Sequence, residues 1–340
     1  MSEHVLRVTD LETSFTRDKK EIKILRGVNF AIRKGEILGL VGESGSGKSL
    51  TSLSIMQLFH GTTGKIVNGA IHFNGEDLTK MSESAIRKIR GKQMAMIFQE
   101  PMTSLNPVLK IGKQLMEAIE MHLKLPKNES RHHAIQMLKN VGIGRAEEII
   151  YEYPHQLSGG MRQRVMIAMA MACHPNLLIA DEPTTALDVT IQAQILEIMK
   201  DIKQKLNTSI ILITHDLGVV ADICDNVNVM YGGLIIEQGT VQDIFYNSKH
   251  PYTWGLMESV PNPNTLVRER LRPIDGQPPD LFKPPKGCPF YARCKYSMEV
   301  CKEHRPRYYE ISQGHQSACW LNDKRAPKVE TPIKRRKEDE

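Results

Sequence analysis

The sequence contains no long apolar run, and this absence limits what the chain can do alone. None of the apolar stretches in its 340 residues approaches the ~18 residues that a membrane-spanning helix needs. The first ten residues, MSEHVLRVTD, also lack the basic and then apolar pattern of a secretion signal. We therefore expect a globular chain whose role at any membrane would require other polypeptides.

The sequence also lacks a strong excess of charge of either sign. Lys and Arg number 45 and Asp and Glu 39, so the formal net charge is only +6. Much of the excess lies in the final stretch, KRAPKVETPIKRRKEDE, and such a run is most often solvated and disordered. We expect residues 326–340 to be a charged, disordered tail, and we expect no nucleic-acid partner.

Cysteine is scarce outside one cluster. Cys173 and Cys224 stand alone in helix-like or apolar surroundings, where a thiol is usually an inert core group. The other four cysteines crowd into the last fifth of the chain: Cys288, Cys294, Cys301 and Cys319. Without a secretion signal, such a cluster indicates a metal or iron–sulfur site before it indicates disulfides.

The order of predicted elements indicates an α/β fold. Residues 5–40 alternate apolar and polar positions, which is typical of half-buried antiparallel strands. Apolar strands are predicted near 93–98, 176–181 and 209–216, with a helical run at 189–205. Strands that alternate with helices predict a mostly parallel sheet, into which a helical subdomain at about 107–165 is inserted.

A glycine-rich loop follows the apolar strand at 36–41. Residues 42–49, GESGSGKS, fit the pattern G-x-x-x-x-G-K-[ST] between a strand and a helix, which is the setting that the pattern requires. Glycines let successive backbone N–H groups curl around a phosphate, and the helix N-terminus adds partial positive charge. Lys48 would then neutralise the β- and γ-phosphates, and the Ser49 hydroxyl would ligate Mg²⁺.

Two carboxylates follow another apolar strand. In LLIADE, residues 177–182, Asp181 would hold Mg²⁺ and Glu182 would orient or deprotonate the attacking water. Adjacent acids at the exit of a buried strand are costly unless cations or hydrogen bonds compensate them. The alternative is a solvated strand end.

Five motifs in this order and spacing resemble the nucleotide-binding subunit of an ABC transporter. Besides the phosphate loop they are FQEP at 98–101, LSGGMRQR at 157–164, DEPTTALD at 181–188 and THD at 214–216. The resemblance implies an ABC-type P-loop domain with a mixed sheet core, an antiparallel β edge and an inserted helical subdomain. It also implies an ATPase that works as a head-to-tail dimer enclosing two ATP molecules.

The resemblance assigns roles to particular residues. Glu182, His215 and Gln99 would be catalytic, and Ser49, Gln99 and Asp181 would hold Mg²⁺. Ser158, Gly159 and Gly160 would reach the partner's nucleotide, and Asp188 would communicate across the dimer. The expected ATP-binding residues are Phe15, Gly42, Ser44, Gly45, Ser46, Gly47, Lys48, Ser49 and Leu50. Phe15 would stack on adenine, although it is equally suited to the core of a strand.

Finer motifs resemble the peptide and nickel importer branch of this family. They are FQEPMTSLNPV at 98–108, DEPTTALDVTIQAQIL at 181–196 and HPYTWGLMESVP at 250–261. The resemblance implies a bacterial dipeptide or oligopeptide importer with a second homologous ATPase, two permease subunits and an extracytoplasmic binding protein. The chain would lie at the cytoplasmic face of the inner membrane. Nickel import is the alternative, and a non-transport ABC ATPase is less favoured.

The terminal cysteines follow the spacing C-x5-C-x6-C-x17-C, which is too wide for the C-x2-C knuckles of a zinc ribbon. Cys₄ ligation of an iron–sulfur cluster tolerates irregular loops, and the resemblance also favours a 4Fe–4S cluster. Zinc and reduced thiols without metal are the alternatives. The expected domains are 1–255 for nucleotide binding, 256–325 for a C-terminal extension with the Cys₄ site, and 326–340 for the tail.

Overall fold

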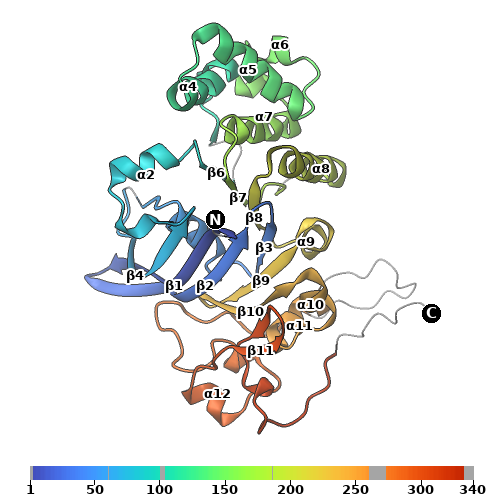
Figure 1. Cartoon of the computed structure of the whole chain (residues 1–340). Coiled ribbons are helices and arrows are strands. Elements are labelled where there is room, and N and C mark those ends of the chain that lie inside the picture. Colours follow the sequence, from blue (N-terminus) through green and yellow to red (C-terminus); the bar gives the residue numbers. More distant parts are fainter. Residues whose placement is uncertain (1–2, 60, 100–103, 186, 260–272, 333–340) are drawn as a thin grey trace, which may run out of the picture. The chain divides into compact units, whose positions relative to one another are not determined.

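The computed structural model describes residues 3–59, 61–99, 104–185, 187–259 and 273–332 (Figure 1). Parts of four predicted features lie outside these ranges. They are residues 100–101 of FQEP, residue 186 of DEPTTALD, residues 260–272 of the C-terminal extension, which include the last two residues of HPYTWGLMESVP, and residues 333–340 of the tail. The described chain forms two compact units. The first comprises Met1–Arg7, Ala31–Ile37 and His72–Ile213, and the second comprises Val8–Phe30, Leu38–Ile71 and Thr214–Glu340.

The first unit contains a parallel sheet in the order β8-β7-β6. Strands β6 (Met94–Ile97), β7 (Leu177–Asp181) and β8 (Ser209–Ile213) pair in register, with Ile179 opposite both Met96 and Ile211. Every residue of β7 and β8 is buried. Burial of both faces is typical of parallel strands covered by helices, and it explains why these segments have unbroken apolar runs.

Helices of the first unit include a group drawn in green at the top of Figure 1. Helices α4 (Ile111–Leu123), α5 (Lys127–Asn140) and α7 (Gly159–Met171) contact one another in pairs. Leu115, Ile119 and Leu138 are fully buried where these helices pack. The unit also holds α2 (Glu83–Ile89), α6 (Ala146–Ile149) and α8 (Val189–Leu206), with the short strand β5 (Glu76–Asp77).

The second unit contains a mixed sheet in the order β11-β12-β10-β9-β3. Strand β3 (Ile37–Val41) pairs with β9 (Asn226–Tyr231) in parallel, and β9 pairs with β10 (Leu234–Thr240) antiparallel. Strands β12 (His315–Ser317) and β11 (Tyr309–Ser312) extend the sheet antiparallel from β10. The cysteine-bearing C-terminal segment thus adds two strands to this sheet.

Helices of the second unit are α1 (Lys48–Ile55), α9 (Leu217–Ile223), α10 (Val241–Tyr246), α11 (Pro251–Glu258) and α12 (Glu299–Glu303). Three long strands contribute residues to both units: β1 (His4–Arg17), β2 (Lys20–Arg33) and β4 (Lys65–Phe73). The α/β class and the mixed sheet predicted from the sequence are therefore confirmed. No helix among the described residues is both long enough and apolar enough to cross a membrane.

Candidate functional site: an ATP-binding cassette

The phosphate loop occupies the turn between β3 and α1 in the second unit. Gly42, Gly45 and Gly47 all have positive φ angles, of 150°, 76° and 110°. A Cβ at Gly42 would lie 2.2 Å from the Met230 carbonyl oxygen, so no larger residue fits there. Gly47 directly precedes α1 and lets the chain enter the helix from a left-handed conformation.

The loop has a polar interior that suits a phosphate. Lys48 is buried and donates to the carbonyl oxygens of Gly42, at 2.8 Å, and Glu43, at 3.0 Å. The Ser46 side chain is buried, and its hydroxyl has no hydrogen-bond partner among the described residues. An unsatisfied buried hydroxyl is costly, and a phosphate oxygen would satisfy it. The N-terminus of α1 and the Lys48 ammonium add positive charge at the same place.

The carboxylates of the first unit lie at the end of β7. Asp181 is the last residue of that strand and is buried, which makes it a suitable oxygen donor for Mg²⁺. Glu182 follows with φ = 48°, an unusual conformation for a residue that is not glycine. Its backbone N–H donates to the Ile213 carbonyl oxygen at 2.8 Å, which holds this turn against the end of β8.

The Glu182 carboxylate is held by two donors. Gln99 Nε2 and Thr185 Oγ1 each lie 2.9 Å from Glu182 Oε2. Both bonds converge on one oxygen and fix the orientation of the carboxylate. Because the Gln99 amide nitrogen faces Glu182, its amide oxygen is the atom suited to a cation. The structure thus brings together Gln99, Asp181 and Glu182 within the first unit.

The signature segment begins α7 in the same unit. Ser158 is the N-cap residue, and its hydroxyl accepts a hydrogen bond from the Met161 N–H at 3.3 Å. A Cβ at Gly159 would meet nothing within 4 Å, whereas a Cβ at Gly160 would lie 2.9 Å from Ile191 Cγ2. Gly159 therefore borders open space, and Gly160 packs against α8. Helix α7 consequently presents an accessible N-terminus, which favours an anion.

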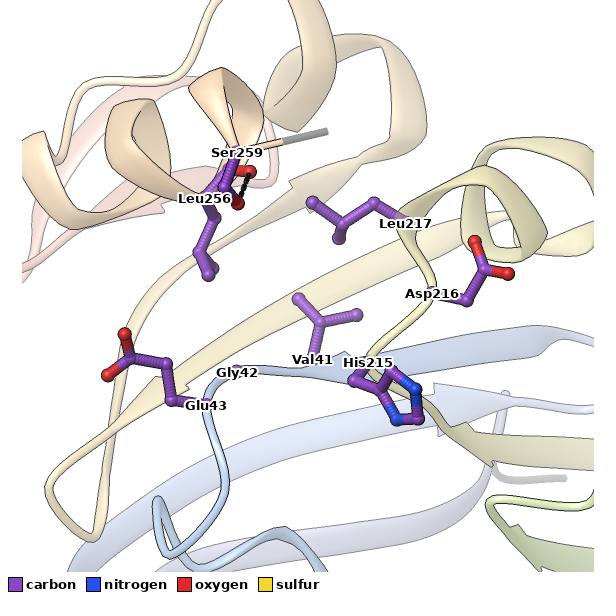
Figure 2. Close-up of a pocket in the computed structure, with 8 residues that line it drawn as sticks. All are labelled: Val41, Gly42, Glu43, His215, Asp216, Leu217, Leu256 and Ser259. Carbon is purple, nitrogen blue, oxygen red and sulfur yellow. Dashed lines mark hydrogen bonds between the residues drawn. The ribbon is translucent and has the colours of Figure 1, made fainter. Parts of the chain in front are cut away.

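A cavity of about 340 Å³ borders the phosphate loop within the second unit (Figure 2). Its walls include Gly42 and Glu43 from the loop and His215 from the turn before α9. Figure 2 shows the apolar side chains of Leu217 and Leu256 directed into it. Asp216, next to His215, caps α9 by accepting from the N–H groups of Gly218 and Val219. That cap fixes the turn that carries His215.

Comparisons with known proteins agree with this geometry. The family model "ABC transporter" matches residues 25–185, and the model "Oligopeptide/dipeptide transporter, C-terminal region" matches residues 236–301. The oligopeptide transport ATP-binding protein OppD of Bacillus subtilis is 52% identical over 96% of this chain and 92% of its own length. The dipeptide transport ATP-binding protein DppD of the same organism is 53% identical over 95% and 96%.

The chain belongs to the ATP-binding proteins of the oligopeptide and dipeptide ABC transporter family. It is accordingly an ATPase of the ABC type. Solved structures agree: a dimeric ATP-binding cassette, MJ0796, bound to ADP and phosphate is 25% identical, with a TM-score of 0.63 over 69% of this chain and 98% of its own. CbiO1 of Clostridium perfringens, part of an ABC transporter complex, is 29% identical, with a TM-score of 0.61 over 72% and 91%.

Two predicted site residues of this ABC ATPase have structural contacts of their own. Asp188 is the N-cap of α8, and its carboxylate accepts from the Ile191 N–H at 3.0 Å. Phe15 is half-buried and meets Phe59 edge to face, with ring centroids 6.5 Å apart. The adenine-stacking role of Phe15 and the dimer role of Asp188 therefore stay predictions.

The prediction of an iron–sulfur cluster is wrong, and the zinc alternative is unsupported with it. The described residues include all four terminal cysteines, yet they contain no group of three or more His, Cys, Asp or Glu side chains arranged to hold a metal. Cys288, Cys301 and Cys319 are buried, and two of them belong to an apolar core cluster with Phe290 and Tyr231. The relatives reported above are named as transport ATP-binding proteins.

Burial also changes the acidity of the thiols. Burial raises the pKa of Cys288 to about 12 and that of Cys294 to about 11, and it also raises the pKa of Cys319. Without a metal, Cys288 and Cys294 are therefore protonated at neutral pH. The residues therefore act as small apolar groups, a reading that their spacing alone did not favour over metal binding.

Three residues with evident structural importance were missed by the sequence reasoning. Gln163 is buried in α7 and donates to the Pro183 carbonyl oxygen, which ties the signature helix to the Glu182 turn. Tyr252 in α11 accepts from the Glu43 N–H at 2.8 Å, and Arg293 forms an ion pair with the Glu43 carboxylate. Gln163 lies inside a quoted motif and offered a signal, whereas Tyr252 and Arg293 lie more than 200 residues from their partner and offered none.

Proposed function

We propose that this ABC ATPase powers the import of dipeptides or oligopeptides through separate permease subunits. The observation that carries the proposal is the pair of close relatives, each named for peptide transport and matched over more than nine-tenths of both chains. The match to the C-terminal region of oligopeptide and dipeptide transporters supports the same branch independently of the nucleotide site. Neither a nickel importer nor a non-transport ABC ATPase is favoured by these relatives.

In this proposal the phosphate loop binds the triphosphate of ATP. Backbone N–H groups from Ser44 to Leu50 surround the β-phosphate, and Lys48 exchanges its carbonyl contacts for phosphate oxygens. The buried Ser46 hydroxyl and the three positive-φ glycines support this assignment. Phe15 is assigned to the adenine ring, where a half-buried aromatic would offer a stacking face.

Glu182 is assigned to the attacking water. Gln99 and Thr185 both donate to Oε2 and hold the carboxylate in one orientation, from which it would orient the water and accept its proton. His215 is assigned to the γ-phosphate, because the imidazole lies on the wall of the cavity that adjoins Gly42. A positioned base and a donor to the transferred phosphate are two of the elements that phosphoryl transfer to water uses.

Mg²⁺ is assigned to Ser49, Gln99 and Asp181, all of which offer the oxygen donors that this ion prefers. When bound, the ion would neutralise charge on the β- and γ-phosphates. The position of Asp181 supports the assignment, because its carboxylate is buried at the end of β7, next to Glu182.

The hydrolytic unit in this proposal is a head-to-tail dimer with a second homologous ATPase. Ser158, Gly159 and Gly160 would contact the γ-phosphate bound by the partner, and Asp188 would relay between the two sites. The open space at Gly159 supports this role, because a Cβ at that position would meet none of the described residues within 4 Å. The MJ0796 cassette is described as dimeric.

The remaining partners are two permease subunits and an extracytoplasmic peptide-binding protein, with this chain peripheral at the cytoplasmic face of the membrane. The C-terminal extension is assigned to residues 256–325, with no metal in it. Closure of the ATPase dimer on ATP would then be coupled to transport at the surface where this chain contacts the permeases.

Reconstituted transport tests this proposal. The chain is co-expressed with candidate permeases, a second homologous ATPase and a peptide-binding protein from the same organism, and ATP-dependent uptake of a labelled dipeptide or pentapeptide into proteoliposomes is measured. We expect peptide uptake that stops in the Glu182→Gln complex. Uptake of ⁶³Ni²⁺ without peptide uptake would assign the nickel function instead, and failure to assemble with permeases would contradict a transport role.

A further inference from the structure

An ion pair connects the C-terminal segment to the phosphate loop. Arg293 Nη1 lies 2.6 Å from Glu43 Oε2, and Arg293 Nη2 lies 3.0 Å from Glu43 Oε1. The guanidinium thus grips the carboxylate with two parallel bonds. This is the strong form of the arginine–carboxylate interaction, because both its geometry and its charge are complementary. Glu43 is the second residue of the glycine-rich motif, 250 positions before Arg293.

Both partners are fixed by further contacts within the same unit. Arg293 also donates to the carbonyl oxygens of Asp275 and Ile274, at 2.9 and 3.0 Å, and to the Tyr231 hydroxyl at 3.2 Å. The Glu43 N–H donates to the Tyr252 hydroxyl. The guanidinium has five N–H groups and five acceptors, and the Arg293 side chain is only 5% exposed. The pair is a built feature rather than a chance surface contact.

Charge explains why such a pair is needed at this place. Glu43 is next to the position where the loop receives a polyphosphate, and its carboxylate would repel that ligand. The pair offsets this charge with a guanidinium that is permanently positive. Burial lowers the pKa of Arg293, but hydrogen bonds to Glu43 and Tyr231 outweigh burial and hold that pKa above its ordinary value.

The pair also controls the position of Lys48. The Lys48 ammonium donates to the Glu43 carbonyl oxygen, so a shift of the Glu43 backbone would move the lysine with it. The side chain of Glu43 is held by Arg293, and its backbone is held by Tyr252. The first turn of the phosphate loop therefore depends on contacts from two later segments of the chain.

We propose that Arg293 is a positioning residue for nucleotide binding: it holds and neutralises Glu43, so that the phosphate loop accepts ATP. The inference rests on the ATP-binding role of this loop and assigns a purpose to the cysteine-bearing segment. Arg293 does not touch the nucleotide in this account. It acts through Glu43, and its effect disappears when Glu43 no longer carries charge.

The test measures the dissociation constant of ATP with Mg²⁺ by titration calorimetry on the full-length chain. Arg293→Met removes the positive charge and both hydrogen bonds to Glu43. It should weaken ATP binding roughly tenfold, because it leaves the Glu43 carboxylate unpaired beside the phosphates. The double variant Glu43→Gln/Arg293→Met removes both charges and should bind ATP within about threefold of the parent. This rescue distinguishes charge compensation from packing, because restored packing is not expected from a change at Glu43.

Two matched variants control the experiment. Arg90→Met breaks the ion pair between Arg90 Nη1 and Glu83 Oε1, 2.7 Å long and in the other unit, and it should leave the ATP dissociation constant unchanged. Lys48→Ala should abolish binding. If Lys48→Ala bound ATP like the parent, the ATP site itself would be misassigned, and that failure is separate from failure of the Arg293 proposal.

Every remaining outcome decides the proposal. Unchanged affinity in Arg293→Met overturns it, as does a double variant that binds ATP as poorly as Arg293→Met. If Arg293→Met does not fold, as judged by circular dichroism, the double variant alone decides. A folded double variant with near-parent affinity supports the proposal, and an unfolded or weakly binding one overturns it.

Discussion

At the scale of single residues, the candidate site depends on side chains held in one orientation by named partners. Glu182 is the best example: its backbone has φ = 48°, and its Oε2 accepts hydrogen bonds from Gln99 and Thr185. A left-handed conformation at a glutamate is energetically unfavourable and persists only where surrounding contacts impose it. The bond from the Glu182 N–H to the Ile213 carbonyl oxygen is one such contact.

Replacing Glu182 with Gln tests this arrangement. The amide keeps the shape of the side chain but cannot accept a proton from water, so we expect ATP hydrolysis to fall by roughly 10²–10⁴-fold while ATP still binds. Steady-state phosphate release and ATP titration measure the two effects. Glu197→Gln on the exposed surface of α8 is the matched control, and normal turnover in Glu182→Gln would remove this residue from the chemistry.

The thiols give a second test at the residue scale. Because the pKa values of Cys288 and Cys294 are raised to about 12 and 11, few thiolates are present at pH 8. We expect these cysteines in the folded chain to be alkylated by iodoacetamide at least about tenfold more slowly than a free thiol with a pKa of ~8.5. Their reaction should quicken only as the pH approaches 11. All six cysteines should react in denaturant, and bound iron or zinc in the purified chain would contradict the protonated state.

At the scale of secondary-structure elements, the sequence predicted where helices and strands lie along the chain better than it predicted which side chains connect them. The strand expected at 176–181 is β7 at Leu177–Asp181, and the helix expected at 189–205 is α8 at Val189–Leu206. These segments have strong apolar periodicity and clear boundary residues, such as the cap Asp188. The bond from Gln163 in α7 to the carbonyl oxygen of Pro183, in the turn after β7, is a contact that periodicity and boundary residues do not predict.

Gln163 supplies the prediction at this scale. Gln163→Met keeps the volume of a buried side chain but leaves the Pro183 carbonyl oxygen without its donor, which costs about 1–3 kcal/mol. We expect the free energy of unfolding in urea to fall by that amount. We also expect kcat to fall more than KM changes, because α7 would no longer hold the Glu182 turn. Gln194→Met on α8 is the comparison, and equal effects in both would show that the Gln163 bond has no special role.

At the scale of the whole molecule, short motifs could be predicted from the sequence, whereas contacts between residues far apart in the chain could not. The phosphate loop, Asp181, Glu182 and the signature were identified because each is a short contiguous motif. The Arg293–Glu43 pair spans 250 residues, so only the folded chain shows it. The cysteine prediction failed for the related reason that spacing along the chain says nothing about burial. In the folded chain Cys288 and Cys301 lie in an apolar core cluster, and Cys294 packs against it.

Ser158 gives the prediction that belongs to the dimer. Ser158→Arg places a bulky charge at the N-terminus of α7, where the account puts the partner's γ-phosphate. We expect ATP binding by this chain to be unchanged, because Lys48 and the phosphate loop belong to its own site. Hydrolysis at the partner's site should be lost. Collapse of ATP affinity in the isolated chain would show instead that Ser158 serves its own nucleotide.

The central claim is that a complete hydrolytic site needs two protomers. The most direct measurement is the ATPase rate of a fixed, low concentration of this chain as the second homologous ATPase, inactivated at its own catalytic glutamate, is added. The account predicts a rate near zero for the chain alone, which rises to saturation with the added protomer and does not rise when that protomer also carries the equivalent of Ser158→Arg. Full turnover by the lone chain at every concentration would contradict it.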